Sequence, residues 1–221
     1  MPLTEQTRSA AREIIARYPK SRSALLPMLH LVQSEEGYVS PAGIALCAEE
    51  LELTKAEVAA VATFYSMYKR RPAGDYHVGV CTNTLCAILG GDAIYDSLKE
   101  HLGVGHNETT PDGKVSLEHI ECNAACDYAP VVMVNWEFYD GQTPQSAREL
   151  VDACRAGSPP PPTRGPASLP TFKAVARVLA GFNDGRGAEG VSAGPASLAG
   201  LELAKTRGDQ APSYPTSGSE G

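Results

Sequence analysis

The segment that decides the fold reads YHVGVCTNTLC and spans residues 76–86. Its first five residues form a short apolar run that is typical of a buried strand, and Cys81 and Cys86 follow at its carboxyl end. A second strand is predicted over 114–120, just before Cys122. Each of these cysteines is expected on a loop at a strand end, where a rigid sheet can bring distant loops together.

The region before this segment has helical spacing. Apolar side chains recur in four short runs with a period near 3.6, which predicts four helices. Gly37 is expected to close the second helix, and Ser40, followed by a proline, to open the third. Thr54 and Glu57 form a capping box before the fourth. Four short helices with short loops predict a small bundle over residues 1–72.

Residues 73–156 are predicted to form an α/β domain around the two strands. The further elements expected are a helix over 92–102, strands over 131–134 and 137–139, and a closing helix from Thr143. The order strand, helix, strand, strand, helix fits a thioredoxin-like half-fold. Pro130 stands where such folds often have a cis-proline, so a cis peptide bond is expected there.

Residues 157–221 have a different composition, with 11 Gly and 9 Pro among 65 residues. This fraction predicts an extended or disordered tail. The pentapeptide GPASL occurs at 165–169 and 194–198, which is too few copies for a repeat fold. An apolar stripe predicts one helix over 171–182, formed by Phe172, Val175, Leu179 and Phe182. Because so short a helix is unstable alone, we expect it either to dock onto a partner or to form only transiently in a disordered tail.

Composition limits the classes of function. The chain has 43% hydrophobic and 20% charged residues, close to the average of soluble globular proteins. A formal net charge of −7 disfavours nucleic-acid binding, which needs a basic stripe. The longest apolar run, 129–134, is far too short for a membrane span, and the N-terminus is too polar for a secretory signal. We therefore expect a cytoplasmic protein without direct membrane insertion, whose cysteines serve as ligands or redox groups.

Four cysteines form two pairs, Cys-x4-Cys and Cys-x3-Cys, about 35 residues apart: Cys81, Cys86, Cys122 and Cys126. Thiolates suit both iron–sulfur clusters and zinc, and a 2Fe–2S cluster needs two thiolates on each iron. Structural zinc sites and thioredoxin-type redox sites favour the narrower Cys-x2-Cys spacing, and a Rieske centre replaces two cysteines by histidines. Spacing alone favours an iron–sulfur cluster and leaves zinc, or buried or disulfide-linked cysteines, as alternatives.

The four cysteines occur together with further motifs: APVV at 129–132 after the second pair, and ATFY at 62–65 and EGY at 36–38 upstream. Over roughly residues 8–156, this combination resembles the thioredoxin-like 2Fe–2S subunit of the NADH-dehydrogenase module of respiratory complex I. NAD-linked hydrogenases and formate dehydrogenases carry similar subunits. Where the family often has Leu-Gly inside the second pair, this chain has Asn123 and Ala124.

The resemblance implies that Cys81, Cys86, Cys122 and Cys126 bind one 2Fe–2S cluster, and that the chain transfers single electrons as a subunit of NADH:quinone oxidoreductase. It implies a partner subunit that binds FMN and NADH, further iron–sulfur subunits, and a place in the peripheral arm on the cytoplasmic side. The alternatives are the equivalent subunit of a hydrogenase or formate dehydrogenase, and a structural zinc module. No residue of this chain is expected to do bond-making chemistry itself.

Two further features are expected to be structural or accidental. Cys47 and Cys154 lie on apolar faces of predicted helices, where free cysteine packs as a small hydrophobe. The letters Gly185-x-Gly187-x-x-Gly190 match the dinucleotide-binding fingerprint, but no strand is predicted before them. We therefore expect this match to be a coincidence.

Overall fold

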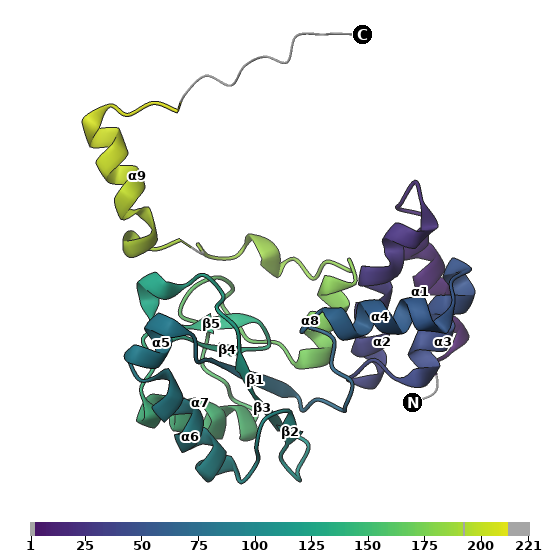
Figure 1. The fold of residues 1–221 in the computed structure, drawn as a ribbon, viewed down its shortest axis with the longest axis horizontal. Helices are drawn as coiled ribbons and strands as arrows, with labels where there is room; N and C mark the ends of the chain where they lie inside the picture. The colour runs from purple at the N-terminus through teal and green to yellow at the C-terminus, as the bar shows by residue number, and fades with distance from the viewer. Residues whose placement is uncertain (1–2, 192, 212–221) are drawn as a thin grey trace.

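The computed structural model describes residues 3–191 and 193–211. It contains a helical body and an α/β body side by side, joined by the segment between α4 and β1 (Figure 1). Of the helices in these residues, none is both long and apolar enough to cross a membrane. The exact limits of independent domains stay a prediction.

The helical body contains the four predicted helices: α1 (Glu5–Ile15), α2 (Leu25–Glu36), α3 (Pro41–Leu51) and α4 (Lys55–Phe64). The residues predicted to begin or end these helices do so in the structure. Gly37 adopts φ 80° at the end of α2, and the Ser40 hydroxyl accepts the Gly43 N–H at 2.9 Å. Thr54 and Glu57 cap α4 reciprocally. Each signal acts within a few residues, which is why it could be recognised in the sequence.

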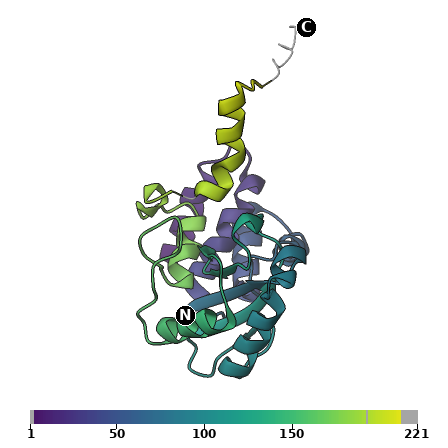
Figure 2. The same ribbon diagram turned by 90° about the vertical axis from the view of Figure 1, so that its left-hand side faces the viewer.

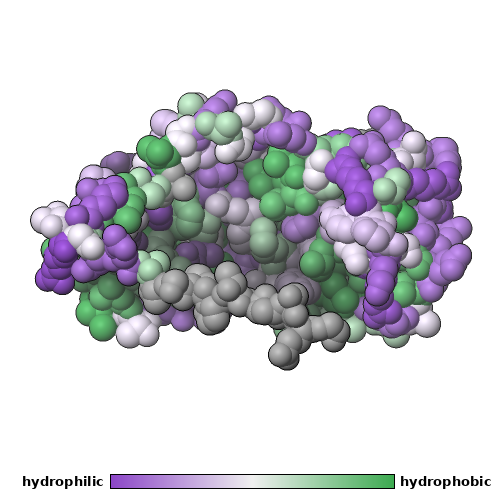
Figure 3. Space-filling model, turned by 90° about the horizontal axis from the view of Figure 1, so that it is seen from above, coloured by the Kyte–Doolittle hydropathy of each residue, from purple (hydrophilic) through white to green (hydrophobic). Residues whose placement is uncertain are grey.

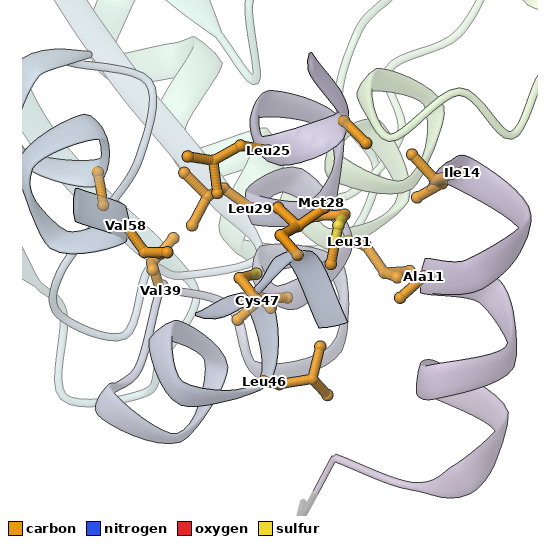
Figure 4. Packing of buried hydrophobic residues seen from close by; sticks show 14 of the residues in the cluster. Ala11, Ile14, Leu25, Met28, Leu29, Leu31, Val39, Leu46, Cys47 and Val58 are labelled. Carbon is orange, nitrogen blue, oxygen red and sulfur yellow. The ribbon is translucent and has the colours of Figure 1, made fainter. Parts of the chain in front are cut away.

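Helix α2 lies at the centre of the bundle. Its Met28 and Leu31 side chains are fully buried and lie between Ala11 and Ile14 of α1 and Cys47 of α3 (Figure 4). Burial of each such side chain contributes roughly 1.5–3 kcal/mol to stability. The outer end of the bundle is mostly hydrophilic (Figure 3). Ion pairs of Arg8 with Glu49 and Glu50 join α1 to α3.

The α/β body has a five-stranded sheet in the order β2-β3-β1-β4-β5. The strands are β1 (Tyr76–Cys81), β2 (Glu108–Thr109), β3 (Val115–Ile120), β4 (Val132–Val134) and β5 (Glu137–Tyr139). Strands β1 and β3 are parallel, and the other neighbours are antiparallel. The two-residue strand β2 was missed because it is too short to show any alternation of apolar residues.

Helices α6 (Gly91–Leu102) and α7 (Pro144–Arg155) confirm the two longer helices predicted for this body. They contact each other and lie on the same face of the sheet (Figure 1). Their buried residues Ile94, Leu98 and Val151 pack with Val78 and Leu117 of the central strands. The crossover through α6 joins the parallel pair β1 and β3 and so brings their carboxyl ends to one edge.

The tail corrects one expectation. The predicted helix is present as α8 (Phe172–Leu179), but it packs against α2 of the same chain, which buries part of its apolar surface without a partner. Phe172 is 1% exposed, and its N–H donates to Asp75 O at 2.7 Å. Lys173 Nζ donates to Glu35 O at 2.7 Å. The chain after α7 therefore returns to the bundle and links both bodies.

A second tail helix, α9 (Pro195–Arg207), was not predicted. It projects from the rest of the molecule (Figure 2) and contacts the 3₁₀ turn Cys126–Tyr128. The second copy of GPASL enters this helix, whereas the first, at 165–169, is irregular. The two copies thus do not form a structural repeat.

Candidate iron–sulfur site

The first cysteine pair lies where β1 ends. Cys81 is the last residue of the strand, and Cys86 lies on α5 (Thr84–Ile88). The prediction that both lie on a loop is therefore wrong, although both do lie at the carboxyl end of the strand. Both are 3% exposed. Gly91 lets the start of α6 approach them, since a Cβ there would lie 2.5 Å from Cys81 O and 2.9 Å from Cys86 O. The first pair is therefore held by a strand and two packed helices.

The second pair lies beyond the end of β3 and is exposed. The Sγ atoms of Cys122 and Cys126 are 3.6 Å apart, and the Ala124 N–H donates to Cys122 Sγ at 3.3 Å. Cys126 starts a 3₁₀ turn, and the following Ala129–Pro130 peptide bond is cis, as predicted. A tight local turn therefore sets the spacing of the two sulfurs.

The sheet brings the two pairs together. Cys81 stands opposite Ile120 in the parallel register, two residues before Cys122. All four predicted cysteines line one small pocket, together with Asn123, Ala125 and Val131. The apolar residues behind it, Val131 and Met133, are buried; sequence reasoning did not assign them to the site, although their apolar run was visible.

The electrostatics of the pocket oppose free thiolates. Burial, with smaller contributions from Cys86 and Cys122, raises the pKa of Cys81 to about 11. The hydrogen bond and charge of Cys122 raise the pKa of Cys126. Four negative charges placed so close together need a bound cation, and coordination deprotonates thiols outright. The donor set therefore fits a soft, positively charged metal centre.

Two pairs of sulfurs suit a two-iron cluster. A 2Fe–2S cluster needs a thiolate pair at each iron, and it favours nearby backbone N–H groups that donate to sulfur. The pairs described above and the Ala124 N–H meet both needs.

The remaining candidates lie away from this pocket. Cys47 and Cys154 are fully buried in two separate cores, as predicted. Burial raises the pKa of each thiol to about 12, so neither is a reactive thiolate. The segment Gly185–Gly190 contains a 3₁₀ turn and follows α8, not a strand, so it lacks the context of a dinucleotide site.

Ala124 shows why a glycine is favoured at this position. Its φ of 55° is left-handed, a region that costs an L-residue roughly 1–2 kcal/mol. We expect Ala124→Gly to stabilise the chain against urea by up to about 1 kcal/mol, because relief of strain exceeds the greater chain entropy of unfolded glycine. Ala125→Gly is the control, since Ala125 is buried with φ −108° and should lose stability. Equal losses in both variants would contradict this account of Ala124.

Comparisons with known proteins agree with this site. The family model for the thioredoxin-like [2Fe-2S] ferredoxin matches residues 11–155. The chain therefore belongs to the thioredoxin-like [2Fe–2S] ferredoxin family, and its cofactor is one 2Fe–2S cluster. The predicted fold, a thioredoxin-like domain preceded by a helical bundle, is confirmed.

Its relatives within the family have a particular role. The chain is 65% identical over 206 residues to a subunit of the NADH-quinone oxidoreductase of Mycobacterium tuberculosis strain H37Rv, covering 93% of this chain and 81% of the relative. It is 40% identical over 148 residues to NADH-quinone oxidoreductase subunit 2 of Thermus thermophilus, covering 66% and 82%. The predicted resemblance is thus confirmed.

A solved structure gives the same fold at lower identity. The NAD+-reducing [NiFe]-hydrogenase in its air-oxidized state aligns with a TM-score of 0.55 and 21% identity. The alignment covers 61% of this chain and 23% of the hydrogenase chain. At that identity the likeness concerns the fold alone.

Proposed function

We propose that this protein transfers single electrons as the 2Fe–2S subunit of an NADH-quinone oxidoreductase. The observation that carries the proposal is the pocket in which two cysteine pairs, from the ends of two parallel strands, meet at the surface. The relatives with 65% and 40% identity, which are subunits of that oxidoreductase, support it. The chain is then part of an enzyme, and its own residues make or break no covalent bonds in the substrate.

The proposed ligands are Cys81, Cys86, Cys122 and Cys126. The bound cluster supplies one-electron redox chemistry at this position. Cys81 and Cys86 hold the inner side, where burial excludes water, and the exposed second pair faces a neighbouring protein. The Ala124 N–H donates to Cys122 Sγ and thereby stabilises negative charge on that sulfur.

The partners follow from this role. FMN and NADH are held by a neighbouring subunit, and further iron–sulfur subunits complete the same complex. The chain then lies in the peripheral arm of a membrane-bound complex, on the cytoplasmic side. The sequence relatives favour this complex over an NAD-linked hydrogenase, whose structure shares the fold at 21% identity.

The test compares two reductants. The isolated, iron-loaded chain is expected to give an EPR signal after dithionite but not after NADH. NADH should produce the signal once the flavin-binding subunit is added. Reduction of the isolated chain by NADH would disprove the assignment of nucleotide binding to a partner. A colourless chain that binds zinc and no iron would establish the structural zinc alternative.

A further inference from the structure

Exposed side chains occur at the end of α4 and on the segment that joins the two bodies, whose path is shown in Figure 1. We call it the linker face and define it by Phe64, Tyr65, Arg70 and Arg71. Phe64 is 80% exposed and Tyr65 is 44% exposed, so two adjacent aromatic rings face the solvent. Among residues 3–191 and 193–211, neither arginine has a hydrogen-bond or ion-pair partner. Tyrosine and arginine are the residue types enriched at the energetic centres of protein interfaces.

The aromatic part of the linker face is held in place from below. The Phe64 ring meets the Tyr65 ring edge-on at 5.0 Å, and Tyr65 meets Tyr68 in the same way at 6.2 Å. Tyr68 is buried, packs on His30 at 4.8 Å, and donates its hydroxyl to Leu26 O at 2.9 Å. These ring contacts connect Phe64 and Tyr65 to the bundle core, so the Tyr65 side chain loses little conformational freedom when a partner binds. Such preorganisation favours affinity.

The linker face borders a cavity of about 410 Å³ between the helical body and strands β2 and β3. Arg70, Arg71 and Lys69 line it, together with His106 and the hydroxyl-bearing Thr109. The volume lies within the range of sites that enclose a ligand or an inserted side chain. The cavity is therefore large enough to admit part of another molecule.

The charge of this cavity is opposite to that of the chain. Among its described lining residues the one acid is Glu118, and it is already bonded to both Lys69 and His77. The two arginines therefore leave positive charge without a counter-charge, on a protein whose formal net charge is −7. A surface of this kind selects a negatively charged occupant.

We propose that the linker face docks an acidic segment of a neighbouring subunit, with its carboxylates beside Arg70 and Arg71 and an apolar side chain against Phe64. This rests on the proposed function, which places the chain in a multi-subunit complex. Exposed aromatic rings favour a protein occupant over a free anion, because a small anion would leave Phe64 uncovered. Arginine binds carboxylates in a bidentate manner, which gives the contact its orientation.

The test uses the full chain in the assembled complex. Arg70→Glu/Arg71→Glu is expected to weaken association with the other subunits by about 10-fold or more, since it places like charges together. Lys55→Glu/Lys99→Glu is the matched control, because it makes the same change in net charge at two exposed lysines outside the linker face. It should retain association within about 2-fold, as expected for surface substitutions. Equal weakening, or none, in both variants would overturn the proposal.

A second measurement keeps both arginines and changes only the exposed Phe64 side chain. A photo-cross-linking amino acid in place of Phe64 is expected to couple this chain to another subunit within the complex. Recovery of cross-links only within this chain would overturn the docking proposal. Iron content and the dithionite-reduced EPR signal of each variant report separately on the electron-transfer function. If Arg70→Glu/Arg71→Glu keeps both its iron content and its EPR signal, and also its association with the other subunits, the docking proposal is wrong and the proposed function is retained.

Discussion

Alanine in place of any one of the four pocket cysteines is expected to lower the iron content from about two atoms per chain to near zero. The reason is geometric, because in the proposed ligation each iron would need both thiolates of one pair, and the described pocket lining holds no spare thiol. Loss of one ligand at Cys122 or Cys126 also leaves that iron open to solvent, since both residues are exposed. The measurement is iron and sulfide per chain with the visible absorption spectrum.

Matched controls exist in the same chain. Cys47→Ala and Cys154→Ala remove buried thiols from the two cores, so they should cost some stability by leaving small cavities. They should keep the iron content and spectrum of the unchanged protein. If either control lost its iron while a pocket variant kept it, the assignment of the ligands would be wrong.

Glu118→Ala is expected to destabilise the folded chain by about 3–5 kcal/mol, because it leaves the buried ammonium group of Lys69 without its counter-charge. The side chains of Lys69, His77 and Glu118 are 10%, 3% and 12% exposed. Glu118 accepts from Lys69 Nζ and lies 2.6 Å from Nε2 of His77. Burial lowers the pKa of His77, so its ring is neutral at pH 7 and donates Nε2–H to Glu118.

Urea unfolding of the apoprotein measures this effect. Glu35→Ala is the matched control, because Glu35 pairs with Arg177 at 3.7 Å on the surface and should cost less than about 1 kcal/mol. The double change Lys69→Met/Glu118→Gln should recover most of the stability, since it removes the charge and keeps a hydrogen-bond acceptor for His77. A loss for Glu118→Ala no larger than that of Glu35→Ala would show that the buried cluster contributes little.

The same group predicts a pH dependence. Burial opposes ionisation of Glu118, but the hydrogen bond from His77 and the charge of Lys69 outweigh it and lower the pKa from 4.5 to about 2. A carboxylate with a lowered folded pKa stabilises the protein above its unfolded value, and this contribution is lost as the pH falls through the folded value. Stability should therefore fall between pH 4.5 and about 2, and less steeply in Glu118→Gln.

The turn beside this cluster shows how tertiary packing overrides local preference. Asn135 and Trp136 join β4 to β5 with φ values of 49° and 71°, both left-handed. Such two-residue turns favour Asn-Gly, so Asn-Trp gives only half of the usual signal. The Trp136 ring lies 4.9 Å from the His77 ring and 5.1 Å from Lys69 Nζ. These contacts offset the backbone strain and would not be visible to a search for turn residues.

The sequence by itself determined the features that depend on near neighbours along the chain. Caps such as Ser40 and the Thr54 box act over one helical turn, and the strands at 76–81 and 115–120 begin with apolar residues at every second position. The cysteine spacings, with the motifs around them, were sufficient to identify the family. These features needed no knowledge of what packs against what.

Only the tertiary structure decided where distant segments meet. It placed Cys86 on a short helix, brought both cysteine pairs to one pocket through the parallel register, and laid α8 on α2. The physical reason is that an apolar stripe in the sequence shows that one face of the helix must be buried, but it does not show which element covers that face. That choice is made by the free energy of the whole packed chain, in which α2 was the available surface for α8.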